Sequence, residues 1–274
     1  MEKIHPNFLI VGAMKAGSTT LMNYLRSHPE VGIPYKEVNY FSNDSRYSKG
    51  IKWYSKWFEN YSSKKMIGEK TPGYSSNPKA VKRIYDLNPD MKLIWILRNP
   101  VKRTYSDYWH CVRYGRELLS IQDCWREQEK LGRAYNKGYF KSSLYADQIE
   151  RFLEHFSLNQ MHFIVFEEFI KDPQKGLDDL SRFLEITPTK YTQDRLVSNK
   201  GYVPYSIKLA YYTNKLLGRG FLFKCIHFFN KKMGSNYIPI DEKLSDQLYA
   251  RFEPENKKLE VLLDRDLSCW NRNS

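Results

Sequence analysis

One stretch near the start of the chain, a short apolar run followed by a glycine-containing loop, constrains the fold more than any other. Residues 8–11 (FLIV) lie between Pro6 and Gly12, which is typical of a buried strand. The loop over residues 12–20 (GAMKAGSTT) follows, and residues 21–28 keep the apolar spacing of a helix. A strand, a glycine loop and a helix in this order can hold a phosphate group, because the helix start supplies free N–H donors.

Two further apolar runs predict strands, over residues 92–97 (KLIWIL) and 161–166 (MHFIVF). Helical spacing is found in four other stretches: residues 105–109, 148–156, 173–184 and 241–263, the last as two helices broken at Pro254. Strands that alternate with helices indicate an α/β fold, a three-layer arrangement with a central parallel sheet between helices. Ligands bind such sheets at the carboxyl ends of the strands, so the loops after residues 11 and 97 are the expected sites.

Length and composition indicate one domain over residues 1–274. An apolar share of 41% is enough for a substantial core, and no repeat or Pro-, Gly- or Ser-rich linker divides the chain. The four cysteines are Cys111, Cys124, Cys225 and Cys269. Because they are widely spaced and form no CxxC pair, we expect reduced thiols, no disulfide framework and no metal site.

Two further features of the sequence, its targeting signals and its net charge, indicate where the protein is located and what it binds. The N-terminal apolar run is too short for a signal peptide, and no stretch reaches the roughly 18 apolar residues of a membrane span, so we expect a cytoplasmic protein. The net charge of +13, from 44 basic and 31 acidic residues, favours an anionic partner. Nucleic acid, a phosphate-bearing cofactor, an acidic glycan and a membrane surface all meet that description, and charge alone does not choose between them.

The glycine loop differs from the phosphate loop of nucleotide hydrolases, which has the pattern GxxxxGK[ST]. Here Gly17 is followed by Ser18, and the lysine lies inside the loop at Lys15. The second predicted strand ends in Arg98, so the metal-binding Asp expected of a hydrolase is missing there. The pattern argues against a magnesium-dependent nucleoside triphosphatase. We expect the hydroxyl group of Ser18 or Thr19 to cap the helix start.

Two motifs in these loops resemble those of the sulfotransferase family that uses 3′-phosphoadenosine 5′-phosphosulfate (PAPS), in the branch of heparan-sulfate sulfotransferases and bacterial relatives. The family's K-x-G-[ST]-[ST] loop binds the 5′-phosphosulfate end of PAPS, and it corresponds here to Lys15, Ala16, Gly17, Ser18 and Thr19, with a further hydroxyl residue, Thr20, directly after them. In the family an Arg at a later strand end and a Ser eight residues on bind the 3′-phosphate, and LRNPVKRTYSDY supplies Arg98 and Ser106. The resemblance implies PAPS as the cofactor and 3′,5′-adenosine bisphosphate as its product.

Further stretches extend the resemblance over nearly the whole chain. They are KEVNYF (36–41), GEKTPGY (68–74), GYFKSSLY (138–145), FEEF (166–169) and NKGY (199–202). In the last stretch, Lys200 and Gly201 match the family's loop over the adenine and the 3′-phosphate. The family has a three-layer α/β domain with a P-loop-like phosphosulfate-binding loop, in agreement with the strands and helices predicted above.

The resemblance also implies an in-line displacement without a metal ion, in which the acceptor loses a proton and negative charge builds on the leaving phosphate. Glu37 matches the family's catalytic base. Lys15, with Lys36, would stabilise the charge on the leaving phosphate and the sulfuryl oxygens. The family often has His two residues after the Glu, whereas this chain has Asn39, which can orient a group but cannot shuttle a proton.

The acceptor side is expected to involve five residues: Lys36, Asn39, Lys70, Tyr74 and His110. Lys70 and Tyr74 follow from the GEKTPGY match, and His110 lies four residues after Ser106 on a predicted helix. Residues 202–229 are the stretch least like the family. Their aromatics and lysines leave three interpretations open: a lid over the acceptor, a basic amphipathic helix on a membrane surface, or packing on the core.

The sequence therefore predicts a bacterial sulfotransferase that moves a sulfuryl group from PAPS to a hydroxyl or amine of a carbohydrate or small natural product, with no nucleic-acid partner. Two alternatives stay open: a non-catalytic basic protein that binds nucleic acid or acidic glycan, and a P-loop kinase. The first would show salt-dependent polyanion binding, and the second magnesium-dependent ATP binding. The sequence indicates neither the acceptor nor the oligomeric state.

Overall fold

The computed structural model describes residues 4–131, 138–191, 201–218 and 220–272. The chain forms two compact units, each made of two separate stretches. The sheet unit contains Met1–Asn99 and Tyr145–Ser198, and the helical unit contains Pro100–Leu144 and Asn199–Ser274. The single domain expected over residues 1–274 stays a prediction.

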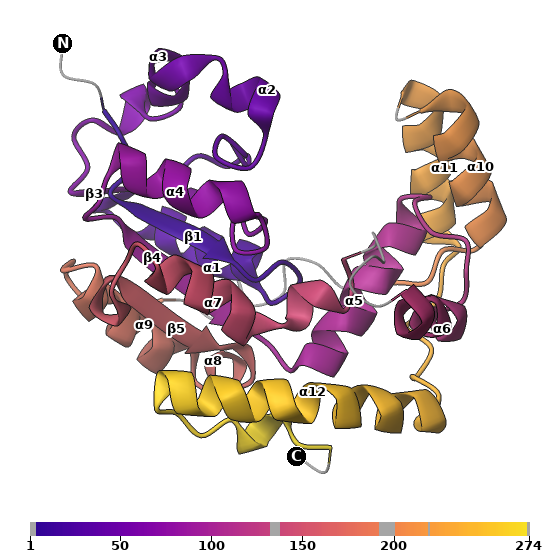
Figure 1. Ribbon diagram of the computed structural model, residues 1–274. Coiled ribbons are helices and arrows are strands. Elements are labelled where there is room, and N and C mark those ends of the chain that lie inside the picture. The colour runs from indigo at the N-terminus through magenta and orange to yellow at the C-terminus, as the bar shows by residue number, and fades with distance from the viewer. Residues whose placement is uncertain (1–3, 132–137, 192–200, 219, 273–274) are drawn as a thin grey trace. The chain divides into compact units, whose positions relative to one another are not determined.

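A five-stranded parallel sheet forms the centre of the sheet unit, with the strand order β2-β3-β1-β4-β5 (Figure 1). Its strands are β1 (Phe8–Gly12), β2 (Val31–Gly32), β3 (Met66–Lys70), β4 (Lys92–Leu97) and β5 (Met161–Val165). Every residue of β1 and β3 is buried, as expected for parallel strands that are covered on both faces. The α/β fold with a central parallel sheet is therefore confirmed.

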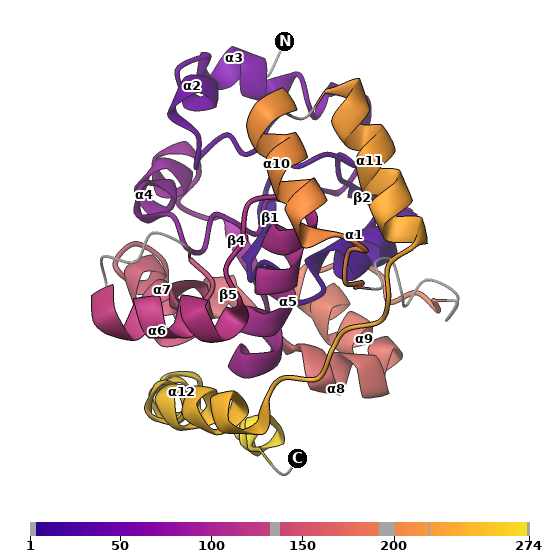
Figure 2. The same cartoon turned by 90° about the vertical axis from the view of Figure 1, so that its right-hand side faces the viewer.

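Helices cover both faces of this sheet (Figures 1 and 2). One face carries α4 (Pro78–Leu87) and α7 (Tyr145–Leu153), and the other carries α1 (Ser18–Ser27), α8 (Phe166–Lys171) and α9 (Pro173–Phe183). Aromatic pairs lie on each side: the ring centroids of Tyr24 and Phe169 are 6.1 Å apart, and those of Tyr85 and Phe156 are 5.5 Å apart. The shorter elements of the unit are α2 (Asp44–Tyr47), α3 (Gly50–Ser55), η1 (Glu59–Tyr61) and η4 (Leu158–Gln160).

The helical unit is built around an apolar cluster between α5 and α12. Its helices are α5 (Pro100–Arg113), α6 (Ile121–Leu131), α10 (Ile207–Leu217), α11 (Phe221–Lys232) and α12 (Glu242–Leu263), with short 3-10 turns η3 (Lys141–Ser143) and η6 (Ser268–Trp270). Trp109 and Val112 of α5 are buried in the cluster with Leu248 and Phe252 of α12. The burial of these large side chains holds the two helices together.

The predicted break of the last helix at Pro254 is wrong, because α12 runs through this proline without interruption. Pro254 lies at an exposed position, whereas Phe252 and Leu259 on either side of it are buried. Packing of the apolar side therefore keeps the helix intact across the one hydrogen bond that proline cannot donate.

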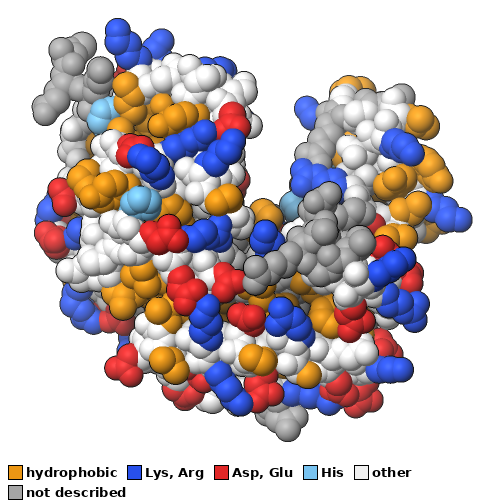
Figure 3. Space-filling view, viewed as in Figure 1, with side chains coloured by type: hydrophobic (Ala, Val, Ile, Leu, Met, Phe, Trp, Pro, Cys, Tyr) orange, Lys and Arg blue, Asp and Glu red, His pale blue; other side chains and the backbone are white. Residues whose placement is uncertain are grey.

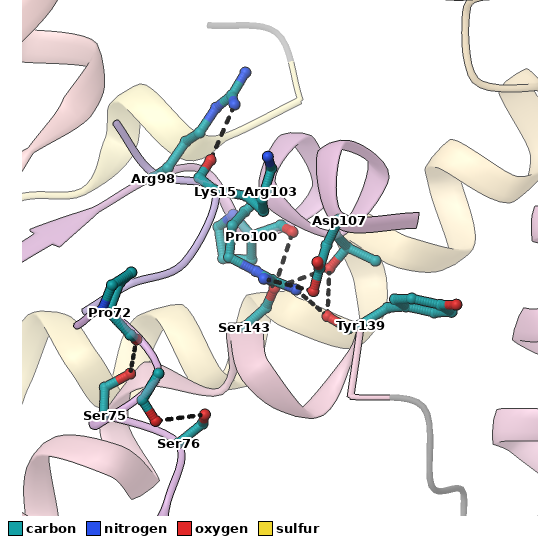
Figure 4. A network of polar contacts seen from close by, with 12 residues as sticks. Lys15, Pro72, Ser75, Ser76, Arg98, Pro100, Arg103, Asp107, Tyr139 and Ser143 are labelled. Atoms are coloured by element: carbon teal, nitrogen blue, oxygen red, sulfur yellow. Dashed lines mark hydrogen bonds and ion pairs between the residues drawn. The ribbon is translucent and has the colours of Figure 1, made fainter. Parts of the chain in front are cut away.

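A buried ion pair fixes the start of α5 within the helical unit (Figure 4). The Arg103 side chain is fully buried, and its Nη1 lies 3.1 Å from Asp107 Oδ2. Its Nε donates to Ser143 Oγ at 2.5 Å, and its other terminal nitrogen donates to the carbonyl oxygen of Tyr139. Ser143 Oγ in turn donates to the carbonyl oxygen of Pro100 at 3.2 Å. These bonds satisfy the buried guanidinium and tie the segment before η3 to α5.

Candidate active site

Three of the motif stretches meet at the carboxyl ends of three neighbouring strands of the sheet unit. The glycine loop follows β1, Lys70 is the last residue of β3, and Arg98 comes directly after β4. Because β3, β1 and β4 are adjacent and parallel, these ends lie at one edge of the sheet. The chain leaves β1 toward β2 on one side and later crosses to β4 on the other, so the loop after β1 lies at the switch point where ligands bind such sheets.

The glycine loop turns into α1 through two residues with left-handed backbone conformation, Lys15 (φ 69°) and Gly17 (φ 100°). A Cβ atom at Gly17 would lie 2.7 Å from the Phe166 ring, so only glycine fits here. Gly17 is the N-cap residue, and within the described part of the chain no side chain caps it. The expected cap by Ser18 or Thr19 is not found, since both residues lie inside the first turn of α1, whose N-terminus carries the positive potential that favours an anion.

Arg98 is held beside this loop. Its Nη1 donates to the carbonyl oxygen of Lys15 at 3.2 Å, and Figure 4 shows the side chain reaching toward that oxygen. The guanidinium carbon lies 5.0 Å from the centre of the Phe166 ring, and the hydroxyl group of Tyr145 donates to the Arg98 carbonyl oxygen at 2.8 Å. The two family-like motifs of the sheet unit are thus in direct contact through Arg98 and Lys15.

Lys70 joins two other predicted site residues. Its Nζ lies 2.6 Å from Glu37 Oε1 and donates to Thr19 Oγ1 at 3.3 Å. The Lys70 side chain is only 7% exposed, whereas that of Glu37 is 41% exposed. The carboxylate compensates the charge of the buried ammonium group, and it stays accessible on its open side.

The loop that carries Glu37 is held by backbone contacts around Asn39, which has a left-handed conformation (φ 52°). The Asn39 N–H donates to Thr71 Oγ1 at 3.2 Å, and its side-chain amide donates to the Glu37 carbonyl oxygen at 3.2 Å. Arg46 donates to the carbonyl oxygen of Val38. Asn39 therefore orients the loop, as an amide can, while the adjacent Lys36 is exposed.

A buried carboxylate beneath this loop was not predicted from the sequence. Glu69 is fully buried and accepts hydrogen bonds from Thr71 and, at 2.7 Å, from the Tyr74 hydroxyl at Oε1, and from Tyr54 at Oε2. The Tyr74 oxygen accepts the Tyr40 N–H at 2.9 Å. Burial raises the pKa of Glu69, although the three hydroxyl donors oppose that shift.

Tyr74, predicted on the acceptor side, belongs to this buried network. Tyr74 is 0% exposed, and burial followed by the nearby charge of Glu69 raises its pKa well above the usual value. A side chain in this position supports the loop that carries Glu37, and a role of Tyr74 toward the acceptor stays a prediction. The signal for Glu69 is present in the GEKTPGY stretch itself, where an acid, a threonine and a tyrosine stand close together.

The remaining predicted residues of the glycine loop are mostly enclosed. Ala16 is fully buried, and Ser18 and Thr20 are 5% and 9% exposed. Lys15 and Thr19 are half-buried. The roles of these residues toward a cofactor stay predictions.

Three predicted residues belong to the helical unit, and one lies outside the described residues. Ser106 and His110 are half-buried on α5, where the His110 ring centroid is 4.8 Å from that of Tyr114. A Cβ atom on Gly201 would overlap the Tyr237 ring, so this glycine is in close contact with it. Lys200 lies outside the described residues.

Three further observations concern metal ligands, membrane spans and cysteines. Among them, no group of three or more His, Cys, Asp and Glu side chains is arranged to hold a metal ion. None of the helices in the described ranges has the length and apolar character to cross a membrane. Of the four cysteines, Cys124 is buried, Cys225 is exposed, and Cys111 and Cys269 are half-buried.

Comparison with known proteins agrees with the residues gathered at this edge of the sheet. Residues 5–206 match the model of the sulfotransferase domain. The chain belongs to the sulfotransferase family. The sulfotransferase resemblance drawn from the sequence motifs is therefore confirmed, and the protein is an enzyme of the PAPS-dependent class.

This sulfotransferase is similar to several heparan-sulfate enzymes. It is 27% identical over 272 residues to heparan sulfate glucosamine 3-O-sulfotransferase 5 of Mus musculus, covering 96% of this chain and 73% of the relative. It is 32% identical over 220 residues to the bifunctional heparan sulfate N-deacetylase/N-sulfotransferase 1 of Caenorhabditis briggsae, covering 73% of this chain and 25% of the relative. A sulfotransferase from Alicyclobacillus acidocaldarius has the same fold, with a TM-score of 0.74 and 28% identity over 97% of this chain and 99% of that one.

Proposed function

We propose that this sulfotransferase transfers the sulfuryl group of PAPS to a hydroxyl or amine of a carbohydrate or small natural-product acceptor. The observation that carries the proposal is the position of Lys70, which binds Glu37 on one side and Thr19 of the glycine loop on the other. These contacts support a site in which Glu37 is the base for the acceptor and the glycine loop beside it holds the leaving phosphate.

The glycine loop fits the 5′-phosphosulfate end of PAPS. The uncapped N-terminus of α1 offers N–H donors and positive potential, and Lys15, Thr19 and Thr20 add a cation and two hydroxyl groups. Arg98, Ser106 and the Lys200-Gly201 pair are proposed for the 3′-phosphate and the adenine on the strength of the motif resemblance.

In the proposed reaction, residues of the sheet unit take the proton from the acceptor and stabilise the charge on the leaving phosphate. When PAPS is bound, it supplies a sulfuryl group whose bond to the 5′-phosphate oxygen breaks as the acceptor atom bonds to sulfur. Glu37 takes the proton from the acceptor. Lys15 and Lys70 stabilise the negative charge that develops on the phosphate side, where the released electron pair remains. The buried position of Lys70 strengthens its effect, since a charge acts over a lower dielectric away from water.

A carbohydrate is supported as the acceptor by the similarity to enzymes that are named for heparan sulfate. Exposed Lys36 lies next to Glu37 and suits an acidic sugar chain. A small natural product is the second candidate, as the family resemblance implies. A bacterial origin and a cytoplasmic location stay predictions.

Calorimetric titration of the purified protein tests the cofactor site. We expect 3′,5′-adenosine bisphosphate to bind without metal and more tightly than ATP with magnesium. Lys15→Ala and Arg98→Ala should weaken this binding, whereas Lys82→Ala, which removes an exposed lysine paired with Asp86 on α4, should leave it unchanged.

Two outcomes would contradict the proposal. Salt-dependent binding of polyanions with no preference for the bisphosphate would favour the non-catalytic binding protein. Magnesium-dependent ATP binding of equal or greater strength would favour the P-loop kinase.

A further inference from the structure

The helices α10 and α11 form a hairpin, residues 207–232, whose inner side is attached to the end of α5. The Asn214 side chain donates to the Gly115 carbonyl oxygen at 3.1 Å, and His227 Nδ1 lies 3.3 Å from the Arg113 carbonyl oxygen. The buried residues of the hairpin are Ala210, Thr213, Phe223 and Asn230, none more than 5% exposed. One side of the hairpin therefore has its packing partners within the helical unit.

The other side of the hairpin exposes large apolar side chains. They are Leu209 (41% exposed), Tyr212 (49%), Leu216 (76%), Phe221 (83%), Leu222 (53%), Phe228 (68%) and Phe229 (52%), and Met233 (52%) follows directly after α11. Spacings of three, four and seven residues place them on one stripe of each helix. Figure 3 shows apolar side chains at the surface of this part, beside lysines. Soluble surfaces rarely gather so many exposed apolar groups without a partner.

The charged side chains of the hairpin and of the residues around it are all basic. Residues 195–240 contain no Asp or Glu, although the chain as a whole has 31 acidic residues. Five lysines of the hairpin are exposed: Lys208, Lys215, Lys224, Lys231 and Lys232. The lysines of α4 differ, since Lys79 and Lys82 each pair with an Asp. The partner of the hairpin must therefore offer negative charge as well as an apolar interior.

We infer that the exposed face of the α10–α11 hairpin binds a bilayer surface that carries anionic headgroups. The phenylalanines and leucines enter the boundary between headgroups and acyl chains, and the lysines bind the lipid phosphates. An acidic glycan or nucleic acid satisfies the lysines but gives Leu216 and Phe221 nothing to enter. With 11 and 12 residues the two helices are too short to span a bilayer, so they lie in its surface. This inference does not depend on the proposed reaction.

Co-sedimentation with vesicles tests the inference, using phosphatidylcholine alone and an equal mixture of phosphatidylcholine and phosphatidylglycerol. We expect the full chain to bind the mixed vesicles and not the neutral ones. The double variant Phe221→Ser/Phe228→Ser should lose at least about tenfold in partitioning. Lys224→Gln/Lys231→Gln should lose about fivefold per lysine and become less sensitive to salt.

Matched controls separate binding from misfolding. Val261→Ser removes an apolar side chain that is 84% exposed on α12, and Lys82→Gln removes an exposed lysine on α4; both should bind vesicles as the wild type does. Because the replaced hairpin residues are exposed, thermal unfolding of the variants should match that of the wild type.

Several results would overturn the inference. The inference is wrong if the protein does not bind the mixed vesicles, or if it binds the neutral vesicles equally well. If the phenylalanine variant instead abolished a concentration-dependent association seen by sedimentation velocity, a second copy of the chain would be the partner. If it lost turnover of a water-soluble acceptor while vesicles bound neither protein, the face would serve as the lid considered for residues 202–229.

Discussion

Lys70 Nζ lies 2.6 Å from Glu37 Oε1 and 3.3 Å from Thr19 Oγ1, so one ammonium group connects the loop after β2 to the first turn of α1. Solvent reaches the carboxylate but hardly reaches the amine, since the two side chains are 41% and 7% exposed. Any movement of Glu37 away from the glycine loop must break this contact. The proposed base and the glycine loop are therefore positioned as one group.

Replacing Glu37 by Gln removes the proton acceptor and keeps the shape. We expect turnover to fall by about 10²–10⁴-fold, because a positioned base contributes this much, while bisphosphate binding stays the same. The measurement is transfer of labelled sulfate from PAPS to a heparan-sulfate oligosaccharide. Glu59→Gln, at an exposed carboxylate of η1, serves as the control. Full activity of the Glu37 variant would mean that the proton leaves by another group.

Gly17→Ala should damage both stability and cofactor binding. The new Cβ would meet the Phe166 ring at 2.7 Å, and φ at 100° is strained for alanine, so we expect the free energy of unfolding to fall by about 1–3 kcal/mol. Denaturant unfolding and bisphosphate titration measure the two effects. Gly73→Ala is the matched control, because its Cβ would meet no atom within 4 Å. The prediction fails if the two variants are equally stable.

Glu69→Gln tests the buried network and has a defined pH dependence. Tyr54 would lose its acceptor at Oε2, at a cost of about 1–3 kcal/mol. The folded-state pKa of Glu69 is raised above its usual 4.5, so the folded protein favours the protonated acid. That contribution to stability is complete below pH 4.5 and is lost as the pH rises through the raised pKa. Denaturant unfolding on both sides of pH 4.5 measures this. The difference in the free energy of unfolding between the wild type and the variant should become smaller as the pH rises.

Asp107→Ala should be strongly destabilising, because it leaves the guanidinium of Arg103 buried without its carboxylate. We expect a loss of about 3–5 kcal/mol in the free energy of unfolding. Asp86→Ala breaks the exposed pair with Lys82 and should cost about 0–1 kcal/mol. Denaturant unfolding measures both losses. Similar losses for the two variants would show that burial does not determine how much the Arg103–Asp107 pair contributes to stability.

The parts of the fold that the sequence predicted are those with continuous apolar runs. β1, β4 and β5 were found in this way, whereas β2 has two residues and β3 reads MIGEK. β3 is nonetheless fully buried, because the nearby hydroxyl groups of Thr71 and Tyr74 bind Glu69, and the distant carboxylate of Glu37 binds Lys70. A local pattern can include the partners of Glu69, but it cannot show a partner such as Glu37, which lies 33 residues before Lys70.

The sequence predicted several residues of the candidate site but not the contacts between them. Its motif residues Lys15, Glu37 and Lys70 were named from the sequence, but the contact between the last two was not. Tyr74 was predicted on the acceptor side from the GEKTPGY match, and a motif gives no sign of which way an aromatic side chain faces. Its burial and its bond to Glu69 are consequences of tertiary packing.

The two units share the chain in alternate pieces, and this has a consequence for biosynthesis. The last strand of the sheet ends at Val165, so the ribosome releases all five strands before it makes α12, which begins at Glu242. α5 ends at Arg113, and its apolar side must wait for the packing partners Leu248 and Phe252 until almost the whole polypeptide has been translated. A nascent chain that stalls in between carries an unsatisfied α5, the kind of surface that chaperones recognise.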